Sequence, residues 1–203
     1  WNVYIVHLNI FLYAFAYWLT QPILPFLLKK MGASTLSFGT FQSLFNAVQL
    51  FGGLVVGYLS DHYSGSTTLS ITQIGSACVY LSLFFATSMT SLYFSRVLTV
   101  IQQAMQVGQA IVSKSVLKDD RAVQFGRLSL SYGLGMISGS FLSGRVNELV
   151  GNDSAAIVIA VACSLLAVPV NATLLDDSSP PVDVSEANKK KDDGDDAEKT
   201  GSS

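Results

Sequence analysis

The sequence has few charged residues. Asp, Glu, Lys and Arg make up only 13% of its 203 residues, against about 25% in soluble domains. Half of the residues are hydrophobic, and the mean hydropathy is +0.44. Many of the charges follow Leu175, so the rest of the chain is poorer still. This composition indicates a protein embedded in a lipid bilayer. There is no basic surface that would predict nucleic acid as a partner.

Signatures of catalysis and metal binding are missing as well. The two cysteines, Cys78 and Cys163, lie inside apolar segments and are typical of packing residues rather than of a disulfide or metal pair. The sequence contains no H-E-x-x-H pair, no G-x-S-x-G elbow and no G-x-x-x-x-G-K-[ST] loop. We therefore expect no enzyme activity, no cofactor and no metal site. Because the chain begins with Trp1, we also expect a fragment of a longer protein.

Six apolar segments reach the roughly 20 residues that a membrane-spanning helix needs. They are approximately Val3–Leu28, Ser37–Leu59, Thr67–Thr87, Leu92–Val112, Gly126–Val146 and Ala155–Leu175. Pro22 and Pro25 are expected to kink or close the first helix. The sequence thus predicts an all-α membrane protein, with a six-helix bundle over residues 1–175. Residues 176–203 have no apolar run and are predicted to be a disordered linker.

Lysine and arginine in the loops predict the orientation in the membrane. One side carries the loop with Lys114, Lys118, Arg121 and Arg127, and the Lys189–Lys191 run. The opposite side carries Lys29, Lys30 and Arg145. This bias predicts that both chain ends are cytoplasmic, in a membrane that the sequence does not identify. Asn152, in an N-x-S triplet, would then face outside as a glycosylation candidate.

Polar residues gather inside several of the predicted spans, where they are costly. The candidate substrate-pathway residues are Tyr17, Gln21, Gln42, Asn46, Gln49, Arg96, Gln103, Gln106 and Gln109. In the second span the spacing of i, i+4 and i+7 places the polar residues on one helix face, and in the fourth Gln102, Gln106 and Gln109 would share a stripe. These side chains either hydrogen-bond a solute in a pathway or join helices to one another. Arg96 either snorkels to the interface or faces the cavity as a fixed charge, which we favour because residues 95–101 offer no acidic partner.

Glycines recur in the fifth span at Gly135, Gly139 and Gly144. In water a glycine-rich helix is poor, because each glycine costs about 1 kcal/mol against alanine. In lipid, small residues let two helix backbones approach closely. We therefore predict a helix-packing face here, which either holds a partner helix fixed or slides against it during a transport cycle.

Three stretches resemble the major facilitator superfamily of transporters. Gly57 and Asp61 match its loop signature G-x-x-x-D-R-x-G-R-R, although the basic run is lost. Arg96 is similar to the conserved arginine of its fourth helix. The stretch 120–144, with the charged loop residues Asp120, Arg121 and Arg127, resembles its fifth helix G-x-x-x-G-P-x-x-G-G, with Ser140 in place of the proline. Longer stretches, such as FGRLSLSYGLGMISGSFLSG, are most similar to its organic cation transporter-like branch.

The resemblance implies a twelve-helix transporter made of two six-helix halves, each with two inverted three-helix repeats. This chain would be the N-terminal half, and its partners would be the missing C-terminal half, the lipid bilayer and a small organic solute. The implied activity is secondary active transport, with protons as the candidate coupling ion and organic cations or drugs as candidate substrates. In this family picture Asp61, with Asp120 and Arg121 nearby, would contact the loop between the fourth and fifth helices and form a latch that stabilises the outward-open state. The alternative is a non-transporting scaffold or receptor built on the same bundle.

Overall fold

The structure is a computed structural model that describes residues 2–151 and 153–174. Asn152 and the predicted linker 176–203 lie outside the described residues. The described part consists of helices joined by short turns and contains no strand. Its elements are α1 (Asn2–Thr20), the 3₁₀ helix η1 (Gln21–Ile23), α2 (Leu24–Lys30), α3 (Thr35–His62), α4 (Gly65–Phe84), α5 (Met89–Leu98), η2 (Thr99–Ile101), α6 (Ala104–Ser115), η3 (Lys118–Asp120), α7 (Arg121–Val150) and α8 (Asp153–Leu174).

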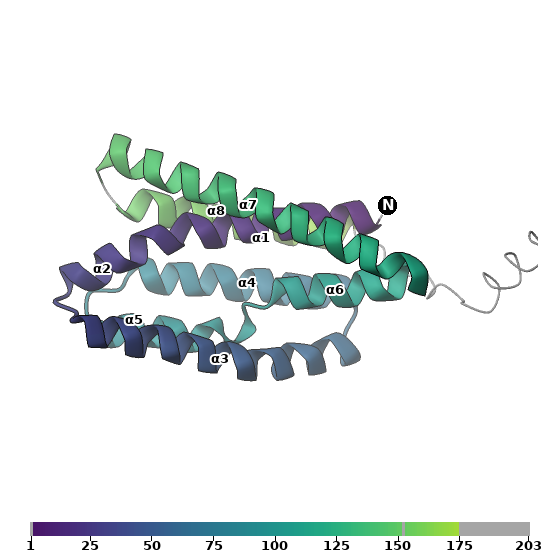
Figure 1. The fold of residues 1–203 in the computed structure, drawn as a ribbon, viewed down its shortest axis with the longest axis horizontal. Coiled ribbons are helices and arrows are strands. Elements are labelled where there is room, and N and C mark those ends of the chain that lie inside the picture. The colour runs from purple at the N-terminus through teal and green to yellow at the C-terminus, as the bar shows by residue number, and fades with distance from the viewer. Residues whose placement is uncertain (1, 152, 175–203) are drawn as a thin grey trace, which may run out of the picture.

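The helices run roughly side by side along the long axis of the molecule (Figure 1). Helix α1 packs against α7, α8 and α6, while α4 packs against α8, α5 and α6. Helix α3 packs against α5, η2 and α6. The first predicted span is interrupted where its prolines predicted, because α1 ends at Thr20 and η1 carries Pro22.

By length and hydropathy, four helices of the described part could cross a membrane: Val3–Lys30, Thr35–His62, Gly65–Phe84 and Ser154–Thr173. Helix α7 has 30 residues and is about 45 Å long at 1.5 Å per residue, but its glycines and serines lower its hydropathy. Helices α5 and α6 have 10 and 12 residues, too few to cross alone. The all-helical prediction is confirmed, and the count of six spans stays a prediction.

Serine side chains set where several helices begin. Ser34 and Ser64 precede α3 and α4, and each accepts a hydrogen bond from a backbone N–H of the first turn. Ser88 and Ser91 form a reciprocal capping box before α5, which satisfies two backbone donors that the helix leaves free. Helix α7 ends at Val150 and is followed by Gly151, whose φ of 63° lies in the left-handed region that glycine favours.

The prediction of one continuous helix over Leu92–Val112 is wrong. Helix α5 ends at Leu98, and the chain passes through η2 before α6 begins at Ala104. Gln102 and Gln103 between them have ψ values of 65° and 35°, outside the helical region. Backbone groups released inside lipid need other partners, and side chains of two neighbouring helices supply them, as described below.

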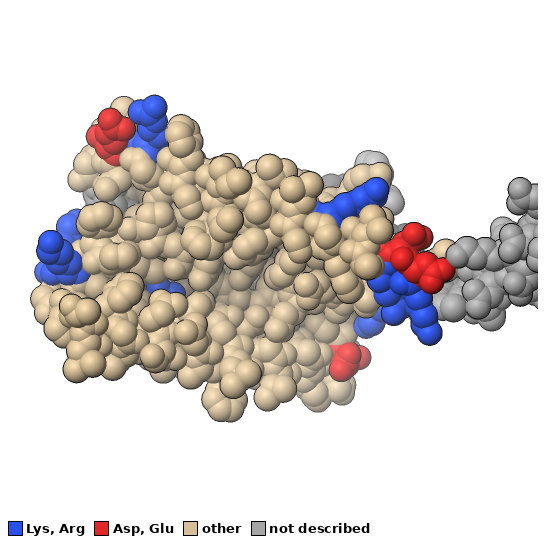
Figure 2. All heavy atoms as spheres, in the orientation of Figure 1, with Lys and Arg blue, Asp and Glu red and all other residues tan. Residues whose placement is uncertain are grey.

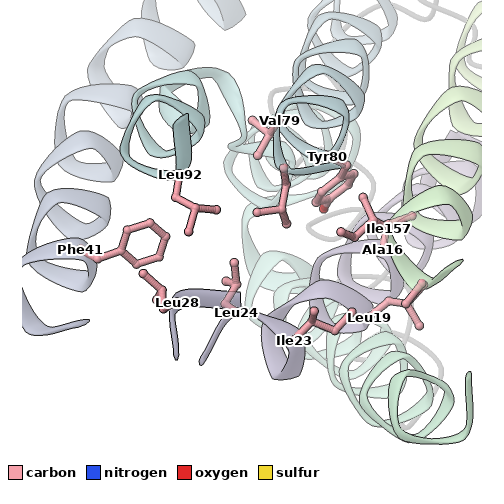
Figure 3. Packing of buried hydrophobic residues seen from close by; sticks show 13 residues of the cluster. Ala16, Leu19, Ile23, Leu24, Leu28, Phe41, Val79, Tyr80, Leu92 and Ile157 are labelled. Atoms are coloured by element: carbon pink, nitrogen blue, oxygen red, sulfur yellow. The ribbon is translucent and has the colours of Figure 1, made fainter. Parts of the chain in front are cut away.

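The larger buried cluster lies toward the end of the bundle that carries α2. Phe41 of α3, Leu28 of α2 and Leu92 of α5 point toward one another in it (Figure 3). A second cluster packs α1 against α6 and α7 nearer the other end, around Val6, Ile10 and Leu128. The two clusters hold the chain around the break between α5 and α6.

Glycines of α7 bring it close to α1. A Cβ added at Gly135 would lie 2.6 Å from the carbonyl oxygen of Phe11, and one at Gly139 would lie 2.4 Å from that of Phe15. Gly144, grouped with them in the sequence prediction, does not share this contact, because a Cβ there would meet no atom within 4 Å. The close approach is therefore limited to the middle of α7.

Charged side chains collect at the two ends of the molecule, and the wide band between them is tan, without acidic or basic groups on most of its visible surface (Figure 2). Large apolar side chains such as Leu54 on α3 and Phe141 on α7 are exposed in the described part. An apolar surface bounded by charged ends is typical of a protein surrounded by lipid.

Candidate functional site

Arg96 is a buried cation inside the helix bundle. It lies on α5, and only 5% of its surface is exposed. Its guanidinium carbon lies 4.5 Å from the ring centre of Phe41 and 5.1 Å from that of Phe45, both on α3. Its Nε is buried without a hydrogen-bond partner. The contacts with Phe41 and Phe45 are cation–π interactions. They stabilise the charge, since a desolvated guanidinium over an aromatic ring gains about 2 kcal/mol.

A pocket with about 260 Å³ of empty space, its open mouth included, adjoins this arginine. Helix α4 contributes Val79, Tyr80 and Leu83 to its wall, and the chain near the helix break contributes Gln102. The first helical segment, α5 and the break supply its polar lining: Tyr17, Thr20, Gln21, Ser95, Arg96 and Gln102. The Tyr17 ring stacks on two neighbouring rings. Its centre lies 6.3 Å from that of Tyr13 and 6.4 Å from that of Phe45. An arginine framed by aromatic rings thus borders a narrow pocket with both polar and apolar walls.

The helix break next to this pocket is held by side chains from α1, α3 and α4. The Gln49 side chain donates to the carbonyl oxygen of Thr99 at 3.2 Å, and the Tyr13 hydroxyl donates to that of Gln102 at 3.0 Å. Gln102 in turn donates to the Tyr80 hydroxyl at 2.9 Å. Gln103 donates to the backbone oxygen of Gln49 at 2.8 Å and also to its side chain. The first two bonds satisfy backbone oxygens at the break, and the others tie the Gln102 and Gln103 side chains to α4 and α3.

A glycine pair on α3 makes room for this arrangement. A Cβ at Gly52 would lie 2.4 Å from the backbone oxygen of Val100, and one at Gly53 would lie 3.0 Å from Nε2 of Gln106. The α3 backbone therefore contacts the broken segment directly. The glutamine stripe predicted for a continuous helix is wrong, because Gln102 is buried against Tyr80 while Gln106 is exposed.

The remaining candidate pathway residues are spread over a more open surface. Gln42 and Asn46 are exposed on α3, and Gln109 of α6 is half-buried. Tyr17 and Gln21 meet Arg96 at the pocket, and Gln49 meets Gln103 at the break. The predicted set thus divides into a pocket group, a bonded group at the break and an exposed group.

The predicted gating residues lie at the opposite end of the bundle from α2. Asp61 is exposed and makes no ion pair with any described residue. A nearby link between helices runs from Nζ of Lys114 to the backbone oxygen of Ser60, at 3.4 Å. Gly57 and Arg127 are exposed, and Nε of Arg121 is buried without a partner. The latch between Asp61 and the loop stays a prediction.

Sequence reasoning missed the residues that frame Arg96 and the break. Phe41 and Phe45 stand at i and i+4 on α3, a spacing that places two rings on one helix face. Gly52 and Gly53 form an adjacent pair inside a long helix, which in lipid indicates a close backbone approach. Both signals were readable. Among the described residues, no group of three or more His, Cys, Asp or Glu side chains could hold a metal ion.

The chain is similar in sequence to solute carriers and to a tetracycline resistance protein. It is 31% identical over 151 residues to solute carrier family 22 member 18 from Mus musculus, covering 72% of this chain and 37% of that protein. It is 30% identical to solute carrier family 67 member A1 from Homo sapiens, with 72% and 36% covered. It is also 30% identical over 135 residues to the class B tetracycline resistance protein from Escherichia coli, with 64% and 34% covered. The chain thus spans just over a third of the length of these relatives.

The fold agrees with this relationship. A crystal structure of the peptide transporter POT in complex with sulfate superposes with a TM-score of 0.73 at 17% identity, covering 98% of this chain and 44% of that one. The chain matches the family model of the Major Facilitator Superfamily over residues 6–199. Its apolar helices and these relatives indicate a multi-pass integral membrane protein. The resemblance read from the sequence motifs is confirmed, and the chain belongs to the major facilitator superfamily.

Proposed function

We propose that this chain forms half of a secondary active transporter that moves small organic solutes across a membrane by alternating access. The observation that carries the proposal is the buried Arg96 beside a narrow pocket whose wall combines polar and apolar side chains. A charge inside a membrane protein is costly, about 2.5–3.5 kcal/mol at a helix centre on insertion scales, and marks a solute or ion pathway by default. Relatives named as solute carriers and tetracycline resistance proteins support transport and leave the solute open.

The proposal includes an arrangement of six spans. They are α1 with η1 and α2, then α3, α4, α5 with η2 and α6, α7, and α8. The spans would form two inverted three-helix repeats, and the second half of the transporter would come from the part of the protein beyond this chain. That half would cover exposed apolar side chains of α3 and α7. The end with Lys114, Lys118, Arg121 and Arg127 would be cytoplasmic.

The charged loop at that end would control the change between the two conformations of the transporter. Asp61 is exposed and unpaired with described residues in this conformation, so it is free to pair when the halves rearrange. We expect Asp61→Asn in the complete protein to lower the transport rate several-fold without changing solute affinity, because a latch alters the balance of two conformations and does not contact the solute. Full transport by this variant would remove the latch from the proposal.

The test of transport uses the complete protein in proteoliposomes. Uptake of labelled organic solutes, organic cations first, is measured with and without a pH gradient. The variants are Arg96→Ala in the pocket and Gln103→Ala at the break, with Arg145→Ala as the matched control, since Arg145 is exposed and pairs only locally with Glu148 at 3.3 Å. We expect flux that both site variants reduce and the control retains.

The outcome with protons separates two mechanisms. Flux that accelerates with an opposing proton gradient supports antiport, whereas flux indifferent to the gradient leaves transport in place and removes proton coupling. Folded, correctly inserted protein that moves no tested solute would contradict transport and favour the scaffold alternative, which the incomplete loop signature around Asp61 and His62 supports.

A further inference from the structure

Arg96 is a buried positive charge without a negatively charged partner among the described residues. Its side chain supplies a full positive charge, yet the described Asp and Glu side chains lie at the ends of the bundle, and none forms an ion pair with it. The guanidinium donates no hydrogen bond to any described residue, and its Nε is buried without an acceptor. A buried guanidinium without anion or acceptor is costly, so an anionic partner at this site would add to the stabilisation from Phe41 and Phe45.

The surroundings of the arginine favour a flat partner. Phe41 and Phe45 lie against the guanidinium, and contact of this kind leaves the N–H groups at its edge as the groups that can donate. A guanidinium edge matches the two oxygens of a carboxylate in a bidentate pair. Tyr17 stacks with Phe45 at 6.4 Å and lines the same pocket as Gln21, so aromatic surface and amide donors continue from the charge.

The size of the pocket limits what it can hold. Its empty space of about 260 Å³ includes an open mouth, and the enclosed part has room for little more than one water-sized group. The pocket therefore suits one end of a solute, with the remainder of the molecule outside it. A cationic end is disfavoured here, because it would meet the Arg96 charge at close range in a low-dielectric site.

We infer that the Arg96 pocket is a subsite for the carboxylate of an organic solute with an aromatic or other flat apolar body. The inference rests on the proposed transport function and narrows its substrate class to carboxylates, including amphoteric solutes whose cationic group lies elsewhere. It differs from the organic cations predicted from the resemblance, because the local charge at this end of the site is positive.

The experiment compares three probes that share one heavy-atom skeleton and differ in charge: benzoate, benzamide and benzamidinium. Each is titrated against the complete purified protein, and the melting temperature and dissociation constant are measured. Benzoate is expected to raise the melting temperature, and the neutral and cationic probes are not. In Arg96→Gln the affinity for benzoate is expected to fall about ten- to a hundredfold, the range for loss of a charge-assisted hydrogen-bonding partner.

Two further variants test whether the Arg96 guanidinium causes the selectivity for benzoate. Arg96→Lys keeps the charge without the planar fork, so it should retain selectivity for benzoate over benzamide with weaker binding. Arg145→Gln removes an exposed guanidinium that pairs with Glu148 and should bind benzoate like the unchanged protein. Equal binding of all three probes, or selectivity for benzoate that survives in Arg96→Gln, would overturn the inference.

A carboxylate supplied by the protein beyond this chain is the competing source. In that case benzoate produces no shift in the unchanged protein, while Arg96→Gln alone lowers the melting temperature by breaking an internal pair, and this result also overturns the inference. Failure of the subsite and failure of transport remain distinguishable. Flux of other solutes without benzoate binding removes only the subsite, and benzoate binding without flux of any solute removes only transport.

Discussion

The close contact between α1 and α7 predicts a specific cost for one added methyl group. In Gly139→Ala the new Cβ would lie 2.4 Å from the carbonyl oxygen of Phe15 and 3.2 Å from the backbone nitrogen of Leu19. Both atoms belong to the α1 backbone, so no side-chain rotation can relieve the overlap. Reaching ordinary contact at about 3.4 Å requires the two helices to separate locally by about 1 Å.

Two opposing effects decide the net result. Alanine is the better helix former by about 1 kcal/mol, which favours the variant. Forcing extra volume into a packed interface costs about 1–3 kcal/mol, and a gap of 0.5–1 Å forfeits a quarter to a half of each dispersion contact nearby. The packing cost is expected to exceed the propensity gain, so Gly139→Ala should be destabilising.

Gly144→Ala is the matched control on the same helix. A Cβ at Gly144 would meet no atom within 4 Å, so this variant receives the propensity gain without the clash. The difference between the two variants isolates the packing effect, and we expect about 1–3 kcal/mol. The assay is reversible unfolding of the complete protein in mixed micelles, titrated with a denaturing detergent. Equal stabilities for Gly139→Ala and Gly144→Ala would refute the reasoning.

The helix break gives two further predictions, both measured by the same unfolding assay. Tyr13→Phe leaves the Gln102 carbonyl without its 3.0 Å donor and should lower the free energy of unfolding by about 1 kcal/mol. Tyr4→Phe, at a side chain 77% exposed, is the control and should leave the stability unchanged. Similar losses of stability in both variants would contradict this role of the Tyr13 hydroxyl. A double-mutant cycle with Gln49→Met and Gln103→Met should give a coupling free energy of about 0.6 kcal/mol, within the range for hydrogen bonds between membrane helices, and strictly additive effects would show that the two amides do not bond.

Much of the helical arrangement could be predicted because each span is a local pattern. The boundaries of α3, α4 and α8 agree with the predicted apolar segments to within about three residues, since hydropathy and serine caps act over short distances. Pro22 also predicted the end of α1, because a proline lacks the N–H that a continuing helix uses.

The break between α5 and α6 could not be predicted in the same way. Residues 98–104 contain neither proline nor glycine, and the cause lies in other helices. Gly52 allows the Val100 carbonyl to approach α3, while Gln49 and Tyr13 supply the donors that the opened backbone needs. A pattern read along one segment does not contain these contacts, so a continuous helix was the expected result.

Some buried polar side chains have hydrogen-bond partners within the described fold and others have none. This difference separates residues that join helices from a residue that indicates a ligand. Gln49, Gln102 and Gln103 have partners, so we interpret them as joining helices around the break. Gln73 of α4 has no partner for its amide atoms, but a neutral amide is far less costly to bury than a guanidinium. Arg96 combines full charge, near-complete burial and a pocket. It is therefore the residue whose missing partner most strongly indicates a ligand.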